Sequence, residues 1–334
     1  MLRLVVDPEL PADELDDDPS IERAAALLRA GGLVAFATET VYGLGGLAHD
    51  EEAARGIFAA KGRPPDDPLI VHVDPSWDLS DVAASWSPLA RRLTEAFWPG
   101  PLTVITPKAE ALPSLITSDL PDVAVRAPAH PVAAALLRKV GRPVAAPSAN
   151  RFSYVSATTA DHVEADLGDA IDAVLDAGPS TAGIESTVVR VEDDHVVVLR
   201  HGALPADAIA ERLGVEVVDA PAAAPSEGSP GRLLTHYAPG THTVARLAGS
   251  SAVPAGSSLI LGFDESVRPD GASFSSLGSL DDLDDVARHL YERLRDADGS
   301  GHDTIVVEFT GRAGLGRALD DRLRKAASGR VIDA

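Results

Sequence analysis

Short apolar segments alternate with amphipathic segments along most of this chain, and this alternation limits its fold more than any other feature. Apolar runs of strand length lie at residues 33–37, 69–73, 102–106, 123–126 and 144–146. Helix-patterned segments lie at residues 21–30, 51–60, 88–97, 130–140 and 205–213. Residues 186–191 and 196–200 predict a hairpin across an acidic turn. Strand–helix alternation with one such pair predicts an α/β fold with an open mixed sheet.

Capping residues set the expected helix boundaries. Ser20 is expected to cap the helix at residues 21–30, and Ser87 followed by Pro88 has the cap-then-proline order that opens a helix. Gly141 is expected to close the helix at 130–140. Ser279 is expected to cap a later helix whose leucines and alanine share one face.

A stretch rich in Ala, Pro, Ser and Gly at residues 219–231 divides the chain. Strand patterns follow it at residues 243–247, 259–263 and 304–309, and the last helix is expected near 319–327. A length of 334 residues also suggests two domains. We therefore predict a first domain at residues 14–218, a linker and lid at 219–242, and a small α/β domain at 243–334.

The charge is strongly negative. The formal net charge is -22, and only four lysines occur, which are Lys61, Lys108, Lys139 and Lys325. This balance argues against stable nucleic-acid binding, which needs clustered cations against phosphate. It also makes each basic residue at a motif position more informative. The chain has no cysteine, so disulfides and thiolate metal sites are excluded.

The N-terminal residues are acidic and proline-rich, without the order of a signal peptide. No apolar run approaches the roughly 20 residues of a membrane span. We expect a cytoplasmic location and no membrane partner.

Several polar clusters follow predicted strands or helices, where α/β sheets place ligands. The first, Thr38–Gly45, is read as a glycine-containing loop, and a plain turn is its alternative. Lys61 and Arg63, if extended, would point the same way and clamp a triphosphate, although a helix C-terminus also favours such residues. His72 lies on a strand, where it could donate a hydrogen bond to a carboxylate or hydroxyl or be merely structural.

Three further clusters lie downstream. Arg126 ends an apolar strand and suits bidentate capture of a carboxylate, with a surface ion pair as the alternative. Ser148 and Asn150 would share a side of an extended segment. The pair His236-Tyr237 in a Pro/Gly-rich segment could cover a pocket.

In this order, the motifs resemble the YrdC-like threonylcarbamoyl-AMP synthases in their longer two-domain form. The stretches that carry the resemblance are TETVYGLG at 38–45, KGRP at 61–64, PLIVH at 68–72, FWPGPLT at 97–103, VAVRAP at 123–128, PSAN at 147–150, ESTVV at 185–189, HYAP at 236–239 and GLGRALDDRLRKAA at 314–327. The resemblance implies a twisted open mixed α/β sheet with a concave cavity, followed by a small Rossmann-like α/β domain.

The resemblance also implies roles for individual residues. It makes Lys61 and Arg63 the catalytic pair. The implied ATP contacts are Lys61, Arg63, Asp67, Ser148, Asn150, Ser156, Arg200 and Tyr237. The implied L-threonine contacts are Thr40, His72, Arg126, Ala146 and Ser186. Asp67 stands where the family pattern has asparagine.

The implied reaction joins L-threonine, bicarbonate and ATP into threonylcarbamoyl-adenylate, with release of pyrophosphate. Mg²⁺ would arrive with ATP, without a dedicated protein metal site. The product would pass to a tRNA threonylcarbamoyltransferase. Two alternatives remain open at this point: a double-stranded RNA-binding module, which the acidic charge disfavours, and a carbamoyl-adenylating transferase.

Overall fold

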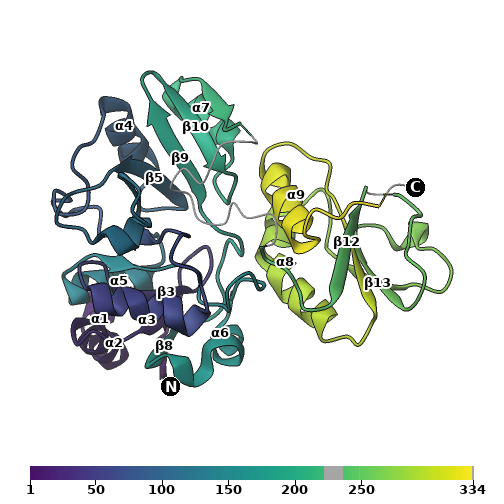
Figure 1. Cartoon of the computed structure of the whole chain (residues 1–334), viewed down its shortest axis with the longest axis horizontal. Helices are drawn as coiled ribbons and strands as arrows, with labels where there is room; N and C mark the ends of the chain where they lie inside the picture. The colour runs from purple at the N-terminus through teal and green to yellow at the C-terminus, as the bar shows by residue number, and fades with distance from the viewer. Residues whose placement is uncertain (222–235, 248, 333–334) are drawn as a thin grey trace.

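The computed structural model describes residues 1–221, 236–247 and 249–332, which form two separate sheets (Figure 1). In these residues the first sheet has 11 strands in the order β1-β8-β2-β3-β7-β4-β6-β5-β9-β10-β11. Its strands are β1 (Leu2–Val5), β2 (Val34–Phe36), β3 (Gly43–Leu47), β4 (Ile70–His72), β5 (Leu102–Pro107), β6 (Asp122–Arg126), β7 (Val144–Ala145), β8 (Ala173–Asp176), β9 (Thr187–Glu192), β10 (His195–Arg200) and β11 (Val217–Asp219).

The helices of the first domain are α1 (Ala12–Asp16), α2 (Pro19–Arg29), α3 (Glu51–Lys61), α4 (Pro88–Phe97), α5 (Pro131–Val140), α6 (Ala160–Leu167) and α7 (Ala206–Leu213). Parallel and antiparallel pairs alternate irregularly in the sheet, so the prediction of an open mixed sheet is confirmed. β4 pairs with β6 in parallel and sets His72 opposite Arg126. β9 and β10 form the predicted antiparallel hairpin.

The second domain has a four-stranded sheet in the order β12-β15-β13-β14, counted over its described residues. Its elements are β12 (His242–Arg246), β13 (Ser258–Gly262), β14 (Ser273–Ser276), α8 (Leu283–Asp298), β15 (Thr304–Glu308) and α9 (Leu315–Ala326). All three strand pairs are parallel, as a Rossmann-like arrangement requires. The predicted apolar face of α8 is confirmed, because Ala287, Leu290 and Leu294 are buried.

Two predicted caps are wrong. Asp18, not Ser20, caps α2, and its carboxylate accepts from the backbone nitrogens of Ser20 and Ile21. Pro19 then takes the first helical position, where its missing N–H costs nothing. Asp282, not Ser279, caps α8 by accepting from the nitrogen of Asp285 at 3.1 Å.

The prediction of a loop through Gly45 is also wrong in part. Thr38 to Tyr42 form the connection, but Gly43–Leu47 form β3, which pairs antiparallel with β2. The first sheet also extends before residue 14, because β1 pairs with β8. The linker boundaries stay a prediction, since residues 222–235 lie outside the described residues.

Helices α8 and α9 face the first domain, and the strands β12 and β13 lie farther from it (Figure 1). Gly183 lies against α8 so closely that a Cβ there would meet the carbonyl oxygen of Ala287 at 2.4 Å. Its φ of +74° also favours glycine. Arg295 on α8 pairs with Asp166 at 2.6 Å, and both side chains are buried or nearly so. The two domains are therefore in close contact through α8.

Within the described ranges, no helix combines the length and the apolar character needed to cross a membrane.

Candidate active site

A cavity opens at the centre of the first sheet, where the ends of several strands meet the residues that precede β12. Its empty space, counted together with the part open to solvent, is about 520 Å³. Its lining residues are Thr38, Thr40, Val41, Tyr42, Gly43, Arg63, Ile70, His72, Arg126, Ala146, Pro147, Ser148, Glu185, Ser186, Arg200, His236 and Tyr237. The first domain supplies all but the last two, so segments far apart in sequence meet at one place.

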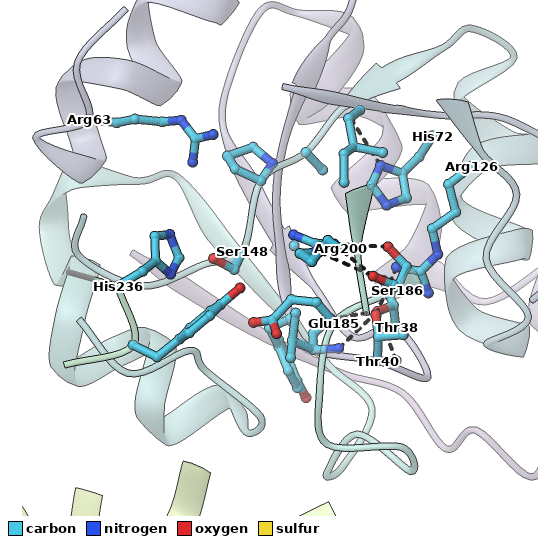
Figure 2. A pocket seen from close by; sticks show the side chains of 17 residues that line it. Thr38, Thr40, Arg63, His72, Arg126, Ser148, Glu185, Ser186, Arg200 and His236 are labelled. Atoms are coloured by element: carbon cyan, nitrogen blue, oxygen red, sulfur yellow. Dashed lines mark hydrogen bonds between the residues drawn. The ribbon is translucent and has the colours of Figure 1, made fainter. Parts of the chain in front are cut away.

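The cavity has two ends. Figure 2 shows His72, Arg126 and Thr40 on the right and Arg63 and His236 on the left, with Arg200 and Glu185 between them. We call Thr40, His72, Arg126 and Ser186 the sheet end. We call Arg63, Ser148, His236 and Tyr237 the linker end.

Arg126 is fixed at the sheet end through each of its side-chain nitrogens. Nη1 donates to the Thr40 hydroxyl at 2.7 Å, and Nε donates to the carbonyl of Gly100 at 3.3 Å. Nη2 lies 2.6 Å from the Glu39 carboxylate. Burial favours the neutral acid, but the Arg126 guanidinium outweighs it and lowers the pKa of Glu39. The guanidinium is therefore held rigidly with a buried counter-charge, as a carboxylate-binding group should be.

His72 is neutral at the sheet end. Burial, with the nearby Arg126 charge as the second cause, lowers its pKa to about 3. Its Nδ1 lies 3.3 Å from the carbonyl oxygen of Ile70, and its ring meets Phe36 edge-on. A neutral imidazole so oriented offers its other nitrogen to a ligand without adding charge.

Arg200 and Ser186 connect the two ends. Arg200 ends β10 and donates to the Ser186 carbonyl at 2.9 Å and to its hydroxyl at 3.1 Å. The Ser186 hydroxyl also bonds the Thr103 hydroxyl at 2.8 Å. The hydroxyl and one guanidinium thus form a single buried unit on the cavity wall.

Arg63 lines the linker end, whereas Asp67 lies behind it. Arg63 donates to the carbonyls of Asp67 and Pro68 at 2.9 and 2.8 Å, and its Nη2 lies 3.0 Å from the Asp67 carboxylate. Burial raises the pKa of Asp67, and the Arg63 charge opposes this shift. Asp67 is not among the lining residues, so it holds Arg63 in place here.

Lys61 and Arg63 do not form the extended pair that the sequence suggested. Lys61 ends α3, and Gly62 follows in the left-handed conformation at φ 63°. Lys61 Nζ donates to the carbonyl of Ser148 at 2.5 Å and also to that of Asn150. Burial, with the Arg63 charge as the second cause, lowers the pKa of Lys61 well below its ordinary value. Lys61 therefore holds the 148–150 turn from behind and is not part of the lining.

The shared side expected for Ser148 and Asn150 is likewise not found, because only Ser148 lines the cavity. Asn150 turns its amide nitrogen to the carbonyls of Arg151 and Tyr154 at 2.7 and 2.9 Å. Of the other predicted contacts, Ala146 lines the cavity beside the sheet end, whereas Ser156 is buried behind it.

His236 and Tyr237 cover the linker end, and both are buried. Their rings meet edge-on with centroids 4.1 Å apart. Tyr237 adopts φ 58°, an uncommon value for a non-glycine residue. Among the described residues, its buried hydroxyl has no hydrogen-bond partner. An unpaired buried hydroxyl beside a cavity is available to a ligand.

Glu185 is the lining residue to which the sequence gave no role. Its Oε1 accepts from the Ser156 hydroxyl at 2.7 Å, and its Oε2 accepts from Tyr291 of α8 at 2.7 Å. Arg322 of α9 donates to Oε2 at 3.1 Å. Burial favours the neutral acid, but Arg322 and Arg200 outweigh it and lower the pKa of Glu185 to about 2. The available signal was an acid directly before an apolar strand, which patterning alone does not explain.

Among the described lining residues the cations outnumber the acids, although the whole chain carries a net charge of -22. Arg63, Arg126 and Arg200 all reach it. No group of three or more His, Cys, Asp or Glu side chains suitable for a metal ion occurs in the part of the chain that the structure describes. Anionic ligands suit this cavity, since three guanidinium groups meet in a partly dry space.

Comparisons with known proteins cover both parts of the chain. A family model described as "Telomere recombination" matches residues 26–202, and one described as "Threonylcarbamoyl-AMP synthase, C-terminal domain" matches residues 205–328.

Two curated relatives match over nearly their full length. The threonylcarbamoyl-AMP synthase of Bacillus subtilis is 42% identical, covering 96% of each chain. That of Pyrococcus abyssi is 40% identical over 93% of this chain and 95% of its own.

The fold also matches a solved structure of Pyrococcus abyssi Sua5 complexed with L-threonine. The TM-score is 0.88 at 35% sequence identity, and the match covers 99% of both chains. Family models and relatives agree over both domains, and this chain therefore belongs to the threonylcarbamoyl-AMP synthase family in its two-domain form.

Proposed function

We propose that this chain joins L-threonine, bicarbonate and ATP into threonylcarbamoyl-AMP and releases pyrophosphate, for the threonylcarbamoyladenosine modification of tRNA. The observation that carries the proposal is the cavity itself. It places Arg126 at one end and Arg63 at the other, with Arg200 between them, in a chain of net charge -22. One carboxylate-binding cation beside two further cations fits an amino acid lying next to a triphosphate.

The sheet end would bind threonine. Arg126 would take the carboxylate with the guanidinium protons that face the cavity, while Thr40 and Glu39 keep the fork in place. His72, as a neutral imidazole, and the Ser186 hydroxyl would bond the side-chain hydroxyl or the amine. Polar groups built for a hydroxyl are left unpaired by an analogue without one, and such a site rejects it strongly.

The linker end would bind ATP. Arg63 and Arg200 would touch the phosphates, and the Ser148 and Tyr237 hydroxyls would bond phosphate, ribose or base. Lys61 would act from behind the lining, because its ammonium already donates to the carbonyls of the 148–150 turn. Asp67, Asn150 and Ser156 would also act from behind the lining, by holding Arg63, the turn and Glu185.

The reaction needs placement and charge neutralisation more than covalent catalysis. The threonine amine and bicarbonate lose water to give a carbamate. The carbamate oxygen then bonds to the α-phosphorus of ATP, and the bond from that phosphorus to the bridging oxygen breaks as pyrophosphate leaves. Arg63 and Arg200 would hold the phosphates in line and offset their charge throughout.

Mg²⁺ would enter with ATP, as part of the nucleotide substrate. It would neutralise phosphate charge and keep most of its own water, so the chain needs no carboxylate cage for it.

His236 and Tyr237 would exclude water from the cavity. The carbamate and the mixed anhydride both hydrolyse in water, and two buried aromatic rings over the linker end would lengthen their lifetime. We propose that the product then passes to a tRNA threonylcarbamoyltransferase in the cytoplasm.

Mass spectrometry of the reaction products tests this function. With ATP, L-threonine, bicarbonate and Mg²⁺, the adenylate and pyrophosphate are expected, and omission of threonine should abolish both. Pyrophosphate release that is independent of threonine, or that occurs with carbamoyl phosphate in its place, would contradict the proposal and favour a carbamoyl-adenylating enzyme.

A further inference from the structure

Of the described residues that line the cavity, Glu185 is the one acid, and the second domain holds it there. Its carboxylate lies between the Ser156 hydroxyl of the first domain and two side chains of the second, Tyr291 and Arg322. Both of these side chains are completely buried. A buried carboxylate keeps its charge only with such partners, since removal of one leaves an uncompensated charge in a dry site.

The same two side chains also hold Tyr237. Its ring stacks on Tyr291, with centroids 5.6 Å apart and an interplanar angle of 29°. The Arg322 guanidinium lies over the ring at 5.4 Å from its centroid. Arg322 further donates to the carbonyl of His201, next to Arg200. One arginine of α9 therefore reaches the lining acid, the covering tyrosine and the strand end that carries a cavity cation.

We propose that Tyr291 and Arg322 are positioning residues for the nucleotide: through Glu185 and Tyr237, the second domain completes the linker end of the cavity. The first domain alone would hold the amino-acid end but would leave Tyr237 and Glu185 without their fixed positions. The inference rests on the proposed function for the identity of the nucleotide, which is ATP.

The second domain contains another buried arginine–glutamate pair, and that pair lies entirely within the domain. Arg246 and Glu308 lie 2.6 Å apart, at 0% and 1% side-chain exposure, wholly within the small sheet. That pair supports the fold of the domain without touching the cavity. Arg322 is as deeply buried, and besides its neighbour Asp321 on α9 it pairs with a buried carboxylate of the first domain, Glu185.

The test compares two hydroxyl deletions of the same kind. Tyr291→Phe removes the bond to Glu185 and keeps the ring. Tyr154→Phe removes another hydroxyl-to-carboxylate bond between the domains, to Asp298 at 2.7 Å, away from the cavity lining. We expect Tyr291→Phe to raise the KM for ATP about tenfold, because the bond lost is to a charged group. The KM for threonine should stay within about twofold, and Tyr154→Phe should leave both values unchanged.

A second pair keeps the test decisive if one variant folds poorly. Arg322→Lys should weaken ATP binding, whereas Arg246→Lys should lower the melting temperature without changing the KM for ATP. Equal changes in both KM values after Tyr291→Phe, or no change in either, would overturn the inference. Calorimetric titration with ATP alone gives the same comparison without turnover. Wild-type protein that binds ATP but makes no adenylate would refute the proposed function and still leave this comparison valid.

Discussion

The two ends of the cavity differ in what holds them. At the sheet end, the partners that the described residues give Arg126 all belong to the first domain: Glu39 and Thr40 between β2 and β3, and Gly100 before β5. At the linker end, Tyr237 rests on Tyr291 and Arg322 of the second domain. The sheet end, where we propose that threonine binds, is thus fixed within one domain, whereas the linker end, proposed for ATP, depends on how two domains meet. Mutations at the sheet end should therefore change mainly the binding of threonine, and mutations at the linker end mainly the binding of ATP.

Loss of Arg63 should give the largest effect. Arg63→Ala removes a cation of the lining and leaves the Asp67 carboxylate buried without its partner. Loss of one member of a buried ion pair costs about 3–5 kcal/mol, and we expect turnover to fall at least 100-fold, mainly through ATP. The rate of pyrophosphate release measures this fall in turnover. The control is Arg55→Ala on the exposed face of α3, which should change turnover less than twofold. Similar activities for the two variants would remove Arg63 from the mechanism.

Arg126→Lys should affect the opposite end. A lysine keeps the charge but cannot form the fork that joins Thr40, Glu39 and a carboxylate. We expect the KM for threonine to rise about 100-fold, which corresponds to about 2.7 kcal/mol, with the KM for ATP nearly unchanged. Steady-state kinetics with each substrate varied in turn provides the measurement. A change confined to ATP would reverse the assignment of the two ends.

Gly183→Ala should disturb the junction between the domains. Its Cβ would meet the carbonyl oxygen of Ala287 at 2.4 Å, so α8 must move. Gly178 is a matched control, because its φ of +78° imposes similar strain while a Cβ there meets nothing within 4 Å. We expect Gly183→Ala to lower the free energy of unfolding by about 2 kcal/mol more than Gly178→Ala and to weaken ATP binding. If both variants lost the same free energy of unfolding, the contact between Gly183 and α8 would adjust to the added Cβ without lowering stability.

The buried histidines should make stability fall in acid. His72 has a folded pKa of about 3, below its ordinary value of 6.5, because burial disfavours the charged ring. The unfolded chain takes up the proton first, so His72 contributes fully above pH 6.5 and loses its contribution as pH falls toward 3. Between pH 6.5 and 5 this amounts to about 2 kcal/mol.

Urea unfolding at the two pH values measures that effect. His72→Gln should flatten the pH dependence by the same amount, while His49→Gln, at a half-exposed surface position, should not. His236 at the linker end has a lowered pKa for the same reason, so some dependence should survive in His72→Gln. An unaltered slope in that variant would mean that His72 titrates normally.

Local patterns predicted most elements of the fold, and they failed where tertiary contacts decide. The strand 123–126 and the helix 88–97 were predictable from apolar runs and a Ser-Pro start, and the structure has them. β3 was not, because Gly43, Gly45 and Gly46 disfavour a strand in isolation. A Cβ at Gly45 would meet Phe36 and Val144 at about 3 Å, so close packing between neighbouring strands selects glycine there.

The site residues likewise divide into those that local sequence patterns predicted and those that tertiary contacts decide. Arg126 could be placed in the cavity from its position at a strand end, and the parallel pairing of β4 with β6 then sets His72 opposite it. Lys61 and Asn150 could not be placed, because one left-handed glycine and one turn point them away from the lining. Glu185 was missed because its partners, Tyr291 and Arg322, are more than 100 positions away along the chain.

The most direct test is a crystal structure with L-threonine and a non-hydrolysable ATP analogue bound together. We expect the threonine carboxylate on Arg126 and the phosphates on Arg63 and Arg200, with the Tyr237 hydroxyl bonded to the nucleotide. Threonine found at the linker end, or a nucleotide bound outside this cavity, would contradict this expectation.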